Sequence, residues 1–475
     1  MSSCKTHSTL EEKEVEILRY AIDIAEKKKG RRVVSDPDVK KIISILEDFL
    51  KKKKLVCYGG TAINNILPLE DQFYDKDIEI PDYDFYSPNA LEDAKELADI
   101  YFKEGFQEVE AKSGVHHGTY KVYVNFIPVA DITHLEKSLF KTVQRDGVRV
   151  YGILYCPPNF LRMNMYLELS RPAGDISRWE KVLKRLILLN KNYPLKGKHC
   201  DPNLFLREFE LTDDKKEEQL YYAVRDSFID QGLIFFGGYA SFLYSKYMPA
   251  KQKKLFQKTP DFDVLSEEPE KAAIMLKERL EDFNYKGIKV IKHNGIGEII
   301  APHYEIKVNV DKIEETVAFI YKPLACHSYN IIKKGNKSVR VATIDTMLSF
   351  YFAFYYSGRD YYDENRILCM AQYLFDVQQK NRLEQKGVLK RFSINCYGKQ
   401  DTLEDMRNEK SEKFKELKGK RNTKEYESWF LRYIPFEETK QKKQQNNKKS
   451  ISKTKKKKSK SQSTKSRKNF IDLLI

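Results

Sequence analysis

Two carboxylates one residue apart, Asp82 and Asp84, are the residues best suited to chemistry in this sequence. They lie among β-forming residues, and side chains two positions apart on a strand point the same way, so both acids face one side. Two like charges on one face repel, which a bound cation would relieve. A solvated pair at a strand edge is the alternative reading, but the pattern recurs at Asp261 and Asp263.

A glycine pair, Gly59 and Gly60, ends an apolar run from Leu55 and precedes a stretch predicted to be helical from about Thr61 to Leu67. Glycine lets the backbone approach an anion, and a helix N-terminus offers free N–H groups and a positive dipole end. The pattern predicts a phosphate-binding turn, with the Thr61 hydroxyl as a further phosphate ligand. An ordinary turn is the alternative.

A third acid, Asp131, stands in the apolar stretch 128–132. Burying a carboxylate there costs several kcal/mol unless it is paired or metal-bound. We therefore expect Asp131 to be a third ligand, with a surface acid at a strand end as the alternative.

The sequence contains an internal repeat. The apolar run with its glycine pair returns at 233–245, Pro81-Asp-Tyr-Asp84 returns as Pro260-Asp-Phe-Asp263, and the alternating stretch 120–125 returns at 304–309. Such self-similarity predicts two domains of one fold in tandem.

The two copies differ where chemistry would take place. Asp131 stands eleven residues after Tyr120, whereas Glu315, in a charged stretch, stands eleven residues after Tyr304. Tyr239 follows the second glycine pair where the first has a threonine. We therefore expect catalysis in the first copy and an eroded second copy.

A glycine pair, a later Asp-x-Asp and a third Asp on a following strand resemble the polymerase-β-type nucleotidyltransferase superfamily. The segments 59–64 and 81–84, the pair Pro157-Pro158 and the stretch 178–185 further resemble poly(A) polymerase catalytic subunits of large nucleocytoplasmic DNA viruses, the asfarvirus and giant-virus versions more than the poxvirus one. The resemblance covers about residues 40–380. One departure is the long gap between the glycine pair and the acids, which predicts an insertion that loops out.

The resemblance implies a template-independent poly(A) polymerase that adds AMP from ATP to the 3′-hydroxyl of RNA in viral mRNA 3′-end maturation. It implies a mechanism with two Mg²⁺ (or Mn²⁺) ions, which hold the attacking and leaving oxygens in line. Asp82 and Asp84 would bind both ions, and Asp131 would hold the ion that activates the 3′-hydroxyl. Carboxylate ligands suit Mg²⁺ better than cysteine or imidazole.

The resemblance also implies nucleotide-binding residues. Gly59, Gly60 and Thr61 would cradle the β- and γ-phosphates. Arg178 and Lys181, at the head of a helix, are candidates for triphosphate contact, with an exposed helical charge pair as the alternative.

The expected fold class is α+β, with tandem duplicated polymerase-β-like nucleotidyltransferase domains, each a small mixed sheet with flanking helices. The expected divisions are an N-terminal helical segment (1–35), the catalytic domain (36–192), a second, inactive domain (193–380), a C-terminal helical extension that packs on the second copy (381–438), and a disordered Lys-rich tail with an apolar end (439–475).

The net charge of +16 resides mainly in the tail. Residues 440–475 contain fourteen Lys and Arg and one acid, a local charge of +13, so the remainder carries only about +3. Such a segment cannot bury a core, and a flexible polycation would hold an RNA backbone by counterion release. A solubility tail and a nuclear-import signal are the alternatives, and the apolar end 469–475 suggests a docking peptide.

Seven scattered cysteines without a C-x-x-C argue against a disulfide framework and a zinc ribbon, and for a reducing compartment. Residues 1–30 are charged throughout, so no signal peptide is expected, and the apolar run 347–356 is too short to span a bilayer. We expect the host cytoplasm, at the viral factory, with packaging in the virion left open.

Two other functions remain open. Another RNA nucleotidyltransferase (CCA-adding, uridylyl or oligoadenylate-synthesising) would share the three acids. A catalytically dead RNA-binding scaffold would not need them intact. The expected partners are an RNA 3′ end and ATP, no membrane is expected, and a homodimer or a processivity partner is left open.

Overall fold

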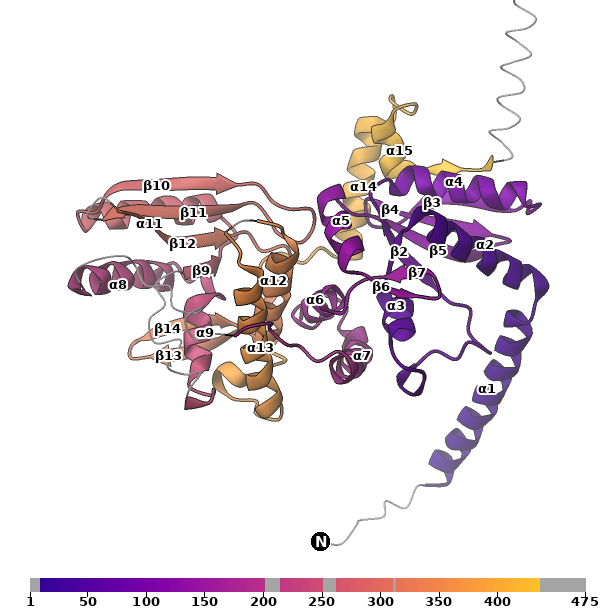
Figure 1. The fold of residues 1–475 in the computed structure, drawn as a ribbon, viewed down its shortest axis with the longest axis horizontal. Helices are drawn as coiled ribbons and strands as arrows, with labels where there is room; N and C mark the ends of the chain where they lie inside the picture. Colours follow the sequence, from indigo (N-terminus) through magenta and orange to yellow (C-terminus); the bar gives the residue numbers. More distant parts are fainter. Residues whose placement is uncertain (1–8, 201–213, 251–261, 311–312, 360, 436–475) are drawn as a thin grey trace, which may run out of the picture.

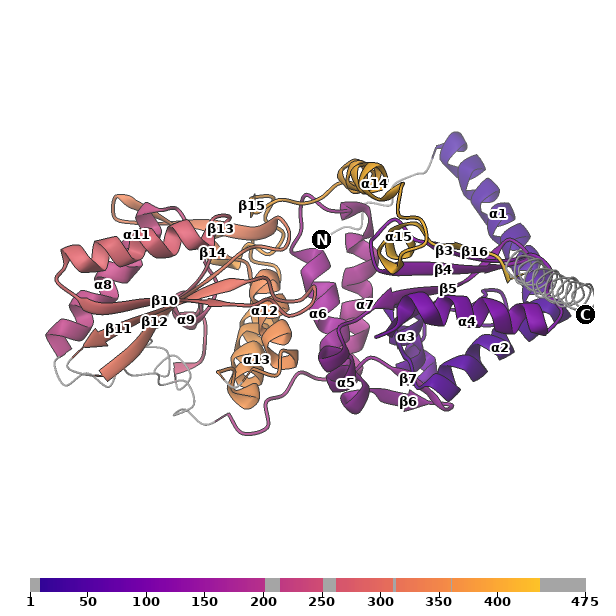
Figure 2. The same ribbon diagram turned by 90° about the horizontal axis from the view of Figure 1, so that it is seen from above.

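The computed structural model describes residues 9–200, 214–250, 262–310, 313–359 and 361–435. The chain forms two lobes, each built on an eight-stranded mixed sheet, with helices α6 and α12 between them (Figure 1, Figure 2). Asp261 and the tail 439–475, with its apolar end 469–475, lie outside the described residues.

The first sheet belongs to the N-terminal lobe and takes one strand from the far end of the chain. In spatial order its strands are β16 (Arg432–Tyr433), β3 (Val109–Ser113), β4 (Thr119–Val124), β5 (Ile127–His134), β2 (Tyr83–Ser87), β1 (Val56–Tyr58), β7 (Ile153–Tyr155) and β6 (Val148–Val150).

The second sheet belongs to the other lobe. In spatial order its strands are β10 (Lys286–His293), β11 (His303–Val310), β12 (Ile313–Tyr321), β9 (Phe262–Leu265), β8 (Ile234–Phe235), β14 (Lys337–Ala342), β13 (His327–Lys334) and β15 (Cys396–Tyr397).

Seven strands of the two sheets share one topology. The order β3-β4-β5-β2-β1-β7-β6 in the first sheet matches β10-β11-β12-β9-β8-β14-β13 in the second. Each parallel pairing (β1 with β7, β2 with β5) has a parallel counterpart (β8 with β14, β9 with β12), and the antiparallel pairings correspond as well. The repeat seen in the sequence therefore coincides with a repeat of strand order.

Helices surround both sheets. In the first lobe they are α1 (Leu10–Val34), α2 (Pro37–Lys53), α3 (Gly59–Ile66), α4 (Ala90–Lys103), α5 (Lys137–Asp146), α6 (Pro158–Leu169) and α7 (Trp179–Asn192). In the second they are α8 (Asp214–Asp230), α9 (Gly238–Ser245), α11 (Pro269–Asp282), α12 (Ile344–Tyr356) and α13 (Glu364–Lys380), followed by α14 (Leu403–Leu417) and α15 (Lys424–Phe430).

Helix α2 forms where its sequence predicts. The Asp36 side chain accepts a hydrogen bond from the Asp38 backbone N–H, proline occupies the first turn, and Lys54 ends the helix in the left-handed conformation. Helices α2 and α4 cover one face of the first sheet, where the Tyr83 hydroxyl donates to Glu47 of α2 (2.8 Å). The opposite face is left for α6 and for the acids.

Helix α1 lies within the segment 1–35 that was expected to be helical. It starts with a capping box at Thr9 and buries none of its residues. Figure 1 shows it projecting away from the first lobe.

The two lobes meet through α6 and α12. The ring of Tyr166 stacks on Phe352 (centroids 6.3 Å apart), and Phe160 meets Tyr356 edge to face (5.1 Å). The Ser328 backbone N–H at the start of β13 donates to the Ser170 carbonyl (2.8 Å). Apolar packing and a backbone hydrogen bond therefore fix the second lobe against the first.

The C-terminal extension was expected to pack on the second copy, and this is wrong for most of its length. Only its start does so, through the pairing of β15 with β13. The chain then returns to the first sheet, where β16 pairs with β3, Lys95 bonds Glu427 (2.8 Å), and the Tyr433 hydroxyl donates to Asp99 (2.7 Å). Residues 398–433 thus form a strap from the second lobe to the first (Figure 2).

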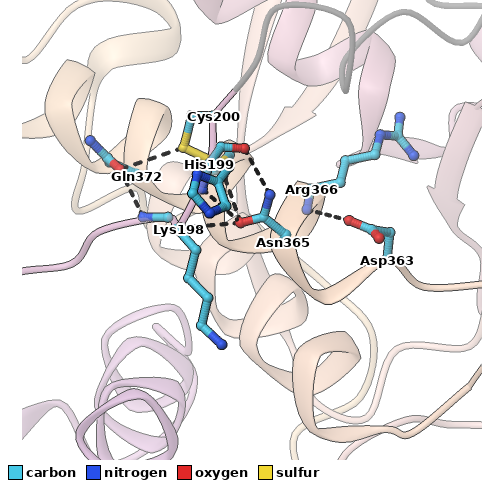
Figure 3. Close-up of a disulfide and its surroundings, with 9 residues drawn as sticks. Lys198, His199, Cys200, Asp363, Asn365, Arg366 and Gln372 are labelled. Atoms are coloured by element: carbon cyan, nitrogen blue, oxygen red, sulfur yellow. Dashed lines mark hydrogen bonds between the residues drawn. A yellow bond between two sulfur atoms is a disulfide. The ribbon is translucent and has the colours of Figure 1, made fainter.

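The expectation of no disulfide framework is also contradicted. Cys200 bonds Cys369 and Cys326 bonds Cys396, while Cys57 and Cys156 are free and buried. The first disulfide joins the segment after α7 to α13 (Figure 3). The second lies where β15 pairs with β13, at the root of the strap. The spacing of the cysteines in the sequence gave no indication of either disulfide.

The insertion between the glycine pair and the acids folds back onto α3 and α7. Asn64 of α3 accepts hydrogen bonds from the backbone N–H groups of Phe73 and Tyr74 (2.8 and 2.9 Å). Asp71 pairs with Lys191 of α7 (2.7 Å). In the described part of the chain, no helix is long and apolar enough to cross a membrane.

The ion pair of Asp345 with Arg391 generates a stability prediction. Asp345 of α12 is fully buried and accepts hydrogen bonds from Nε and Nη2 of Arg391 (2.8–3.0 Å), which ties the segment before the strap to the second lobe. Asp345→Asn leaves a buried guanidinium without its counter-charge, so we expect a loss of about 3–5 kcal/mol in the free energy of unfolding.

The control is Glu180→Gln, which breaks the exposed pair of Glu180 with Lys184 on α7. Urea unfolding should resolve no more than about 0.5 kcal/mol for this variant. Equal losses in the two variants would contradict the assignment of Asp345 as an anchor.

Candidate active site

Three acids gather on the face of the first sheet that α2 and α4 leave open. Asp84 of β2 is the register partner of Asp131 on the parallel neighbour β5, and Asp82 comes one residue before β2 begins. Lys121 of β4 is in turn the register partner of Asp131. Because β2 and β5 run parallel and adjacent, the pairing of backbones brings acids separated by 47 positions side by side.

The acids perturb one another. Burial, followed by the charges of Asp82 and Asp131, raises the pKa of Asp84 to about 7, against the opposing charges of Lys121 and Arg178. Burial and the charge of Asp131 likewise raise the pKa of Asp82. Burial and mutual repulsion therefore both disfavour the charged forms of Asp82 and Asp84, and the neighbouring cations offset this only in part.

Lys121 supplies one positive charge. Its ammonium group donates a hydrogen bond to Asp131, and although burial lowers the pKa of Lys121, the contact with Asp131 outweighs burial and the pKa is raised. Among the described residues, no group of three or more His, Cys, Asp or Glu side chains is already arranged to hold a metal ion. The donor set nevertheless fits Mg²⁺ or Mn²⁺, because it consists of carboxylate oxygens with unrelieved mutual repulsion.

The glycine turn lies directly against the acids. Gly59 has a positive φ of 74°, and a Cβ atom there would lie 2.5 Å from Oδ2 of Asp84. At Gly60 a Cβ atom would lie 2.4 Å from the Tyr74 hydroxyl and 3.0 Å from Nη1 of Arg185. The turn therefore requires glycine at position 59 for its left-handed conformation and at position 60 for the close approach of Tyr74 and Arg185.

Thr61 does not have the role that the sequence suggested. Its hydroxyl is buried and donates to the backbone carbonyl of Asp82 (2.6 Å), so it is committed to holding the acid-bearing strand against α3. The first four N–H groups of α3 lack intrahelical partners, so these groups are the ones in the turn that could bind an anion.

The two basic candidates on the α7 side differ. Arg178 is exposed and pairs with Glu168 of α6 (3.1 Å), yet its charge also reaches Asp84. Lys181 is exposed, and its charge lowers the otherwise raised pKa of Asp82. Both charges therefore lower the pKa of a neighbouring acid, while contact of either residue with a triphosphate stays a prediction.

Sequence reasoning missed Arg185 and Tyr74. The Arg185 guanidinium donates to the Tyr74 hydroxyl (2.6 Å), lies over the Phe73 ring (4.7 Å) and approaches Gly60. Arg185 belongs to the stretch 178–185 that resembles the viral family, and this resemblance was the only indication of its role in the sequence. Tyr74 lies in the insertion, which the sequence could only predict to loop out.

The counterpart in the second lobe is built differently. Asp263 of β9 pairs in register with Phe319 of β12, so a phenylalanine occupies the position that Asp131 has in the first sheet. Glu315, expected at that position, lies four residues earlier on the strand. The ring of Phe319 stacks on Tyr361 (centroids 5.7 Å apart), and the remaining space is only about 50 Å³.

Gly59→Ala tests the close approach of the turn to Asp84. A left-handed residue other than glycine costs about 1–2 kcal/mol, and here the new Cβ also collides with the Asp84 carboxylate. The matched control is Gly335→Ala, which has a similar φ (61°) but nothing within 4 Å of the new Cβ. We expect unfolding experiments to find a larger loss at Gly59, and equal losses would contradict this packing.

Asp84→Asn tests the electrostatics of the site in metal-free protein. Because the folded-state pKa of Asp84 is raised from 3.8 to about 7, ionisation destabilises the fold as the pH rises through this range. The variant does not ionise at this position and so does not lose this stability. Its melting temperature should equal that of the wild type near pH 4 and exceed it at pH ~8. The difference at the higher pH should correspond to a few kcal/mol in the free energy of unfolding, at about 1.4 kcal/mol per pKa unit.

Asp23→Asn on the exposed helix α1 is the control for this measurement. A constant difference between Asp84→Asn and wild type across the pH range would contradict the raised pKa. Calorimetry in the presence of a chelator provides the measurement.

Comparisons with known proteins converge on this region. Residues 44–175 match the family described as poly(A) polymerase catalytic subunit. A protein of African swine fever virus named "Putative poly(A) polymerase catalytic subunit" is 31% identical over 194 residues, which are 40% of this chain and 39% of the relative. The protein of the same name from Acanthamoeba polyphaga mimivirus is 30% identical over 189 residues, 38% of this chain and 30% of the relative. The matches therefore span well under half the length of these relatives.

The fold agrees over a longer span. The crystal structure of the Megavirus polyadenylate synthase superposes with a TM-score of 0.75 at 21% identity, covering 95% of this chain and 90% of that one. The mixed α/β fold is therefore shared through both lobes. The predicted resemblance is confirmed: residues 44–175, which carry the three acids and the glycine turn, match the poly(A) polymerase catalytic subunit family, and the chain is similar to its members in large DNA viruses.

Proposed function

We propose that this protein is a template-independent poly(A) polymerase that transfers AMP from ATP to the 3′-hydroxyl of RNA. The observation that carries the proposal is the register pairing of Asp84 with Asp131, with Asp82 beside them and the Gly59 turn against Asp84. An anion-binding turn next to clustered carboxylates suits the transfer of a nucleotide from a triphosphate. The names of the viral relatives favour ATP and a poly(A) product.

Asp82, Asp84 and Asp131 would hold two Mg²⁺ or Mn²⁺ ions. When bound, such ions neutralise the charge that accumulates on the transferred phosphoryl group and activate the attacking hydroxyl. The raised pKa of Asp84 supports this role, because a divalent cation would offset the burial and the repulsion that raise it. Lys121 would then give up its contact with Asp131 or share it.

The triphosphate would lie on the α3 side of the acids. The N–H groups of Gly59, Gly60 and Thr61 would bind β- and γ-phosphate oxygens, with Arg185 and Lys181 supplying positive charge. In the reaction, the RNA 3′-oxygen forms a bond to the α-phosphorus, the bond from that phosphorus to the bridging oxygen breaks, and pyrophosphate leaves. Positioning and charge neutralisation provide most of the catalysis of such transfers.

The second lobe is proposed to be a duplicated copy that has lost catalysis. Its strand order supports the duplication, and Phe319 at the position of the third acid supports the loss. Its role in this proposal is to complete the surroundings of the active site in the first lobe. Host-cytoplasmic location and a further protein partner remain predictions of the resemblance alone.

Primer extension tests the proposal. Full-length protein, a labelled oligoadenylate, each of the four triphosphates and Mg²⁺ or Mn²⁺ should give long tails with ATP. Asp84→Asn should lower the rate by at least about a hundredfold, since each loss of ~1.4 kcal/mol in transition-state stabilisation is tenfold. Asp263→Asn, the equivalent change in the second lobe, is the matched control and should retain activity.

The alternatives predict other outcomes. Tails with UTP or short additions of defined sequence would identify a different nucleotidyltransferase. RNA retention without turnover under every condition would favour a scaffold and contradict the proposal. Loss of activity in Asp263→Asn alone would move catalysis to the second lobe.

A further inference from the structure

A cavity of about 680 Å³ lies where the two lobes and the strap meet. Its walls come from the ends of β4 and β5, from α6, from the loop 297–299, from α12 and β13 of the second lobe, and from α14 and α15 of the strap. Its volume is typical of sites that enclose a small molecule or one unit of a polymer.

The cavity adjoins the acids. Tyr86 and Thr133 line it, and they follow Asp84 and Asp131 by two residues, which is about 7 Å along a strand on the same face. Tyr58, the residue before the glycine turn, also lines the cavity, and its hydroxyl is hydrogen-bonded to the Thr133 hydroxyl (2.8 Å). A group bound in the cavity would therefore lie within reach of the acids.

Aromatic rings form two walls of this cavity. Tyr58 stacks on Tyr86 (centroids 4.0 Å apart), and His117 stacks on Trp429 of the strap (4.1 Å). Within each pair one face of each ring is already covered, so a nucleobase would stack on an outer face of the pair, a contact that shows little preference for sequence.

The second lobe, through His327, and the segment after α6, through Arg171, contribute buried polar atoms that have no hydrogen-bond partner among the described residues. His327, only 2% exposed, lines the cavity with both ring nitrogens unbonded, and Nε of Arg171 beside it is also buried and unbonded within the described part of the chain. Burial and the charge of Arg171 lower the pKa of His327 to about 3, so the ring is neutral, with one donor and one acceptor. Leaving such groups unpaired is unfavourable, and a ligand that forms hydrogen bonds with them would recover that free energy.

The charge of the walls limits the kind of ligand. The cavity is also lined by four acids, which disfavour a run of phosphates. The acids are Glu136, Glu298, Asp401 and Glu409. A single nucleoside, with one aromatic base and few charges, suits the cavity better than a stretch of RNA backbone.

We propose that this cavity binds the 3′-terminal nucleoside of the RNA acceptor, with the base stacked on the aromatic walls and hydrogen-bonded to His327 and Arg171. The assignment rests on the proposed function and adds to it that the second lobe contributes directly to the acceptor site. The 3′-hydroxyl would then face the acids, across from the triphosphate.

The test replaces the unpaired polar atoms by apolar groups of similar shape, in the full-length protein. His327→Phe and Arg171→Met should raise the KM for a short oligoadenylate about tenfold, the effect of losing ~1.4 kcal/mol of binding. The KM for ATP should change by less than about twofold, well below that tenfold criterion. His327→Phe should not lower the melting temperature, because it removes unpaired buried groups.

Tyr239→Phe is the matched control. It removes a buried hydroxyl that has no hydrogen-bond partner in the described chain but lies in the second lobe, away from the cavity lining. Both KM values should stay at wild-type level. A rise in the KM for oligoadenylate here would contradict the specific role of His327.

Other outcomes overturn the assignment. A rise in the KM for ATP alone would place the base of ATP in the cavity, and no change in either KM would show that neither substrate uses it. Binding of 5′-fluorescein oligoadenylate, followed by anisotropy, needs no turnover. If the wild type proves inactive, the proposed function fails. Weaker oligoadenylate binding by His327→Phe than by Tyr239→Phe would still support the acceptor site. Equal binding by the two variants would reject it.

Discussion

The architecture depends on one electrostatic constraint, the repulsion among three acids held side by side by strand pairing. Asp84 and Asp131 are adjacent because β2 and β5 are parallel and in fixed register, so neither can move away without breaking the sheet. Lys121 neutralises part of the charge, and burial together with the remaining repulsion raises the pKa of Asp84. The sheet, α3 and the Thr61 contact to Asp82 all hold this unfavourable cluster in place, as functional sites commonly require.

The second lobe has the same scaffold without three mutually repelling acids. Its strand order is the same, yet Phe319 and Tyr361 fill the space beside Asp263 with stacked rings. In this lobe aromatic rings pack where the first lobe has repelling acids. The apolar surface that these rings bury stabilises the lobe. A lobe stabilised in this way can serve as a rigid wall against the first, and the strap that crosses back to β3 holds the two together.

Much of this could be predicted from local sequence. The glycine pair, the Asp-x-Asp segment and the repeat gave strands β1 and β2, helix α3 and their counterparts, because each depends on neighbours in the chain. Long-range pairing could not be predicted in the same way. The register of β12 put Phe319 rather than Glu315 beside Asp263, because the β11–β12 hairpin extends two residues further on each strand than the β4–β5 hairpin. Counting eleven residues from Tyr304, as from Tyr120, therefore misses the position by four. The path of the strap, the two disulfides and the contact of Arg185 with Tyr74 likewise depend on segments distant in sequence.

The most direct measurement is anomalous diffraction from crystals of the full-length protein grown with Mn²⁺ and a non-hydrolysable ATP analogue. The account predicts manganese peaks among Asp82, Asp84 and Asp131, with the analogue's phosphates against the Gly59 turn, and none beside Asp263. A peak beside Asp263, or clear density for the analogue without manganese at the first-lobe acids, would contradict the assignment of these three carboxylates as the catalytic centre.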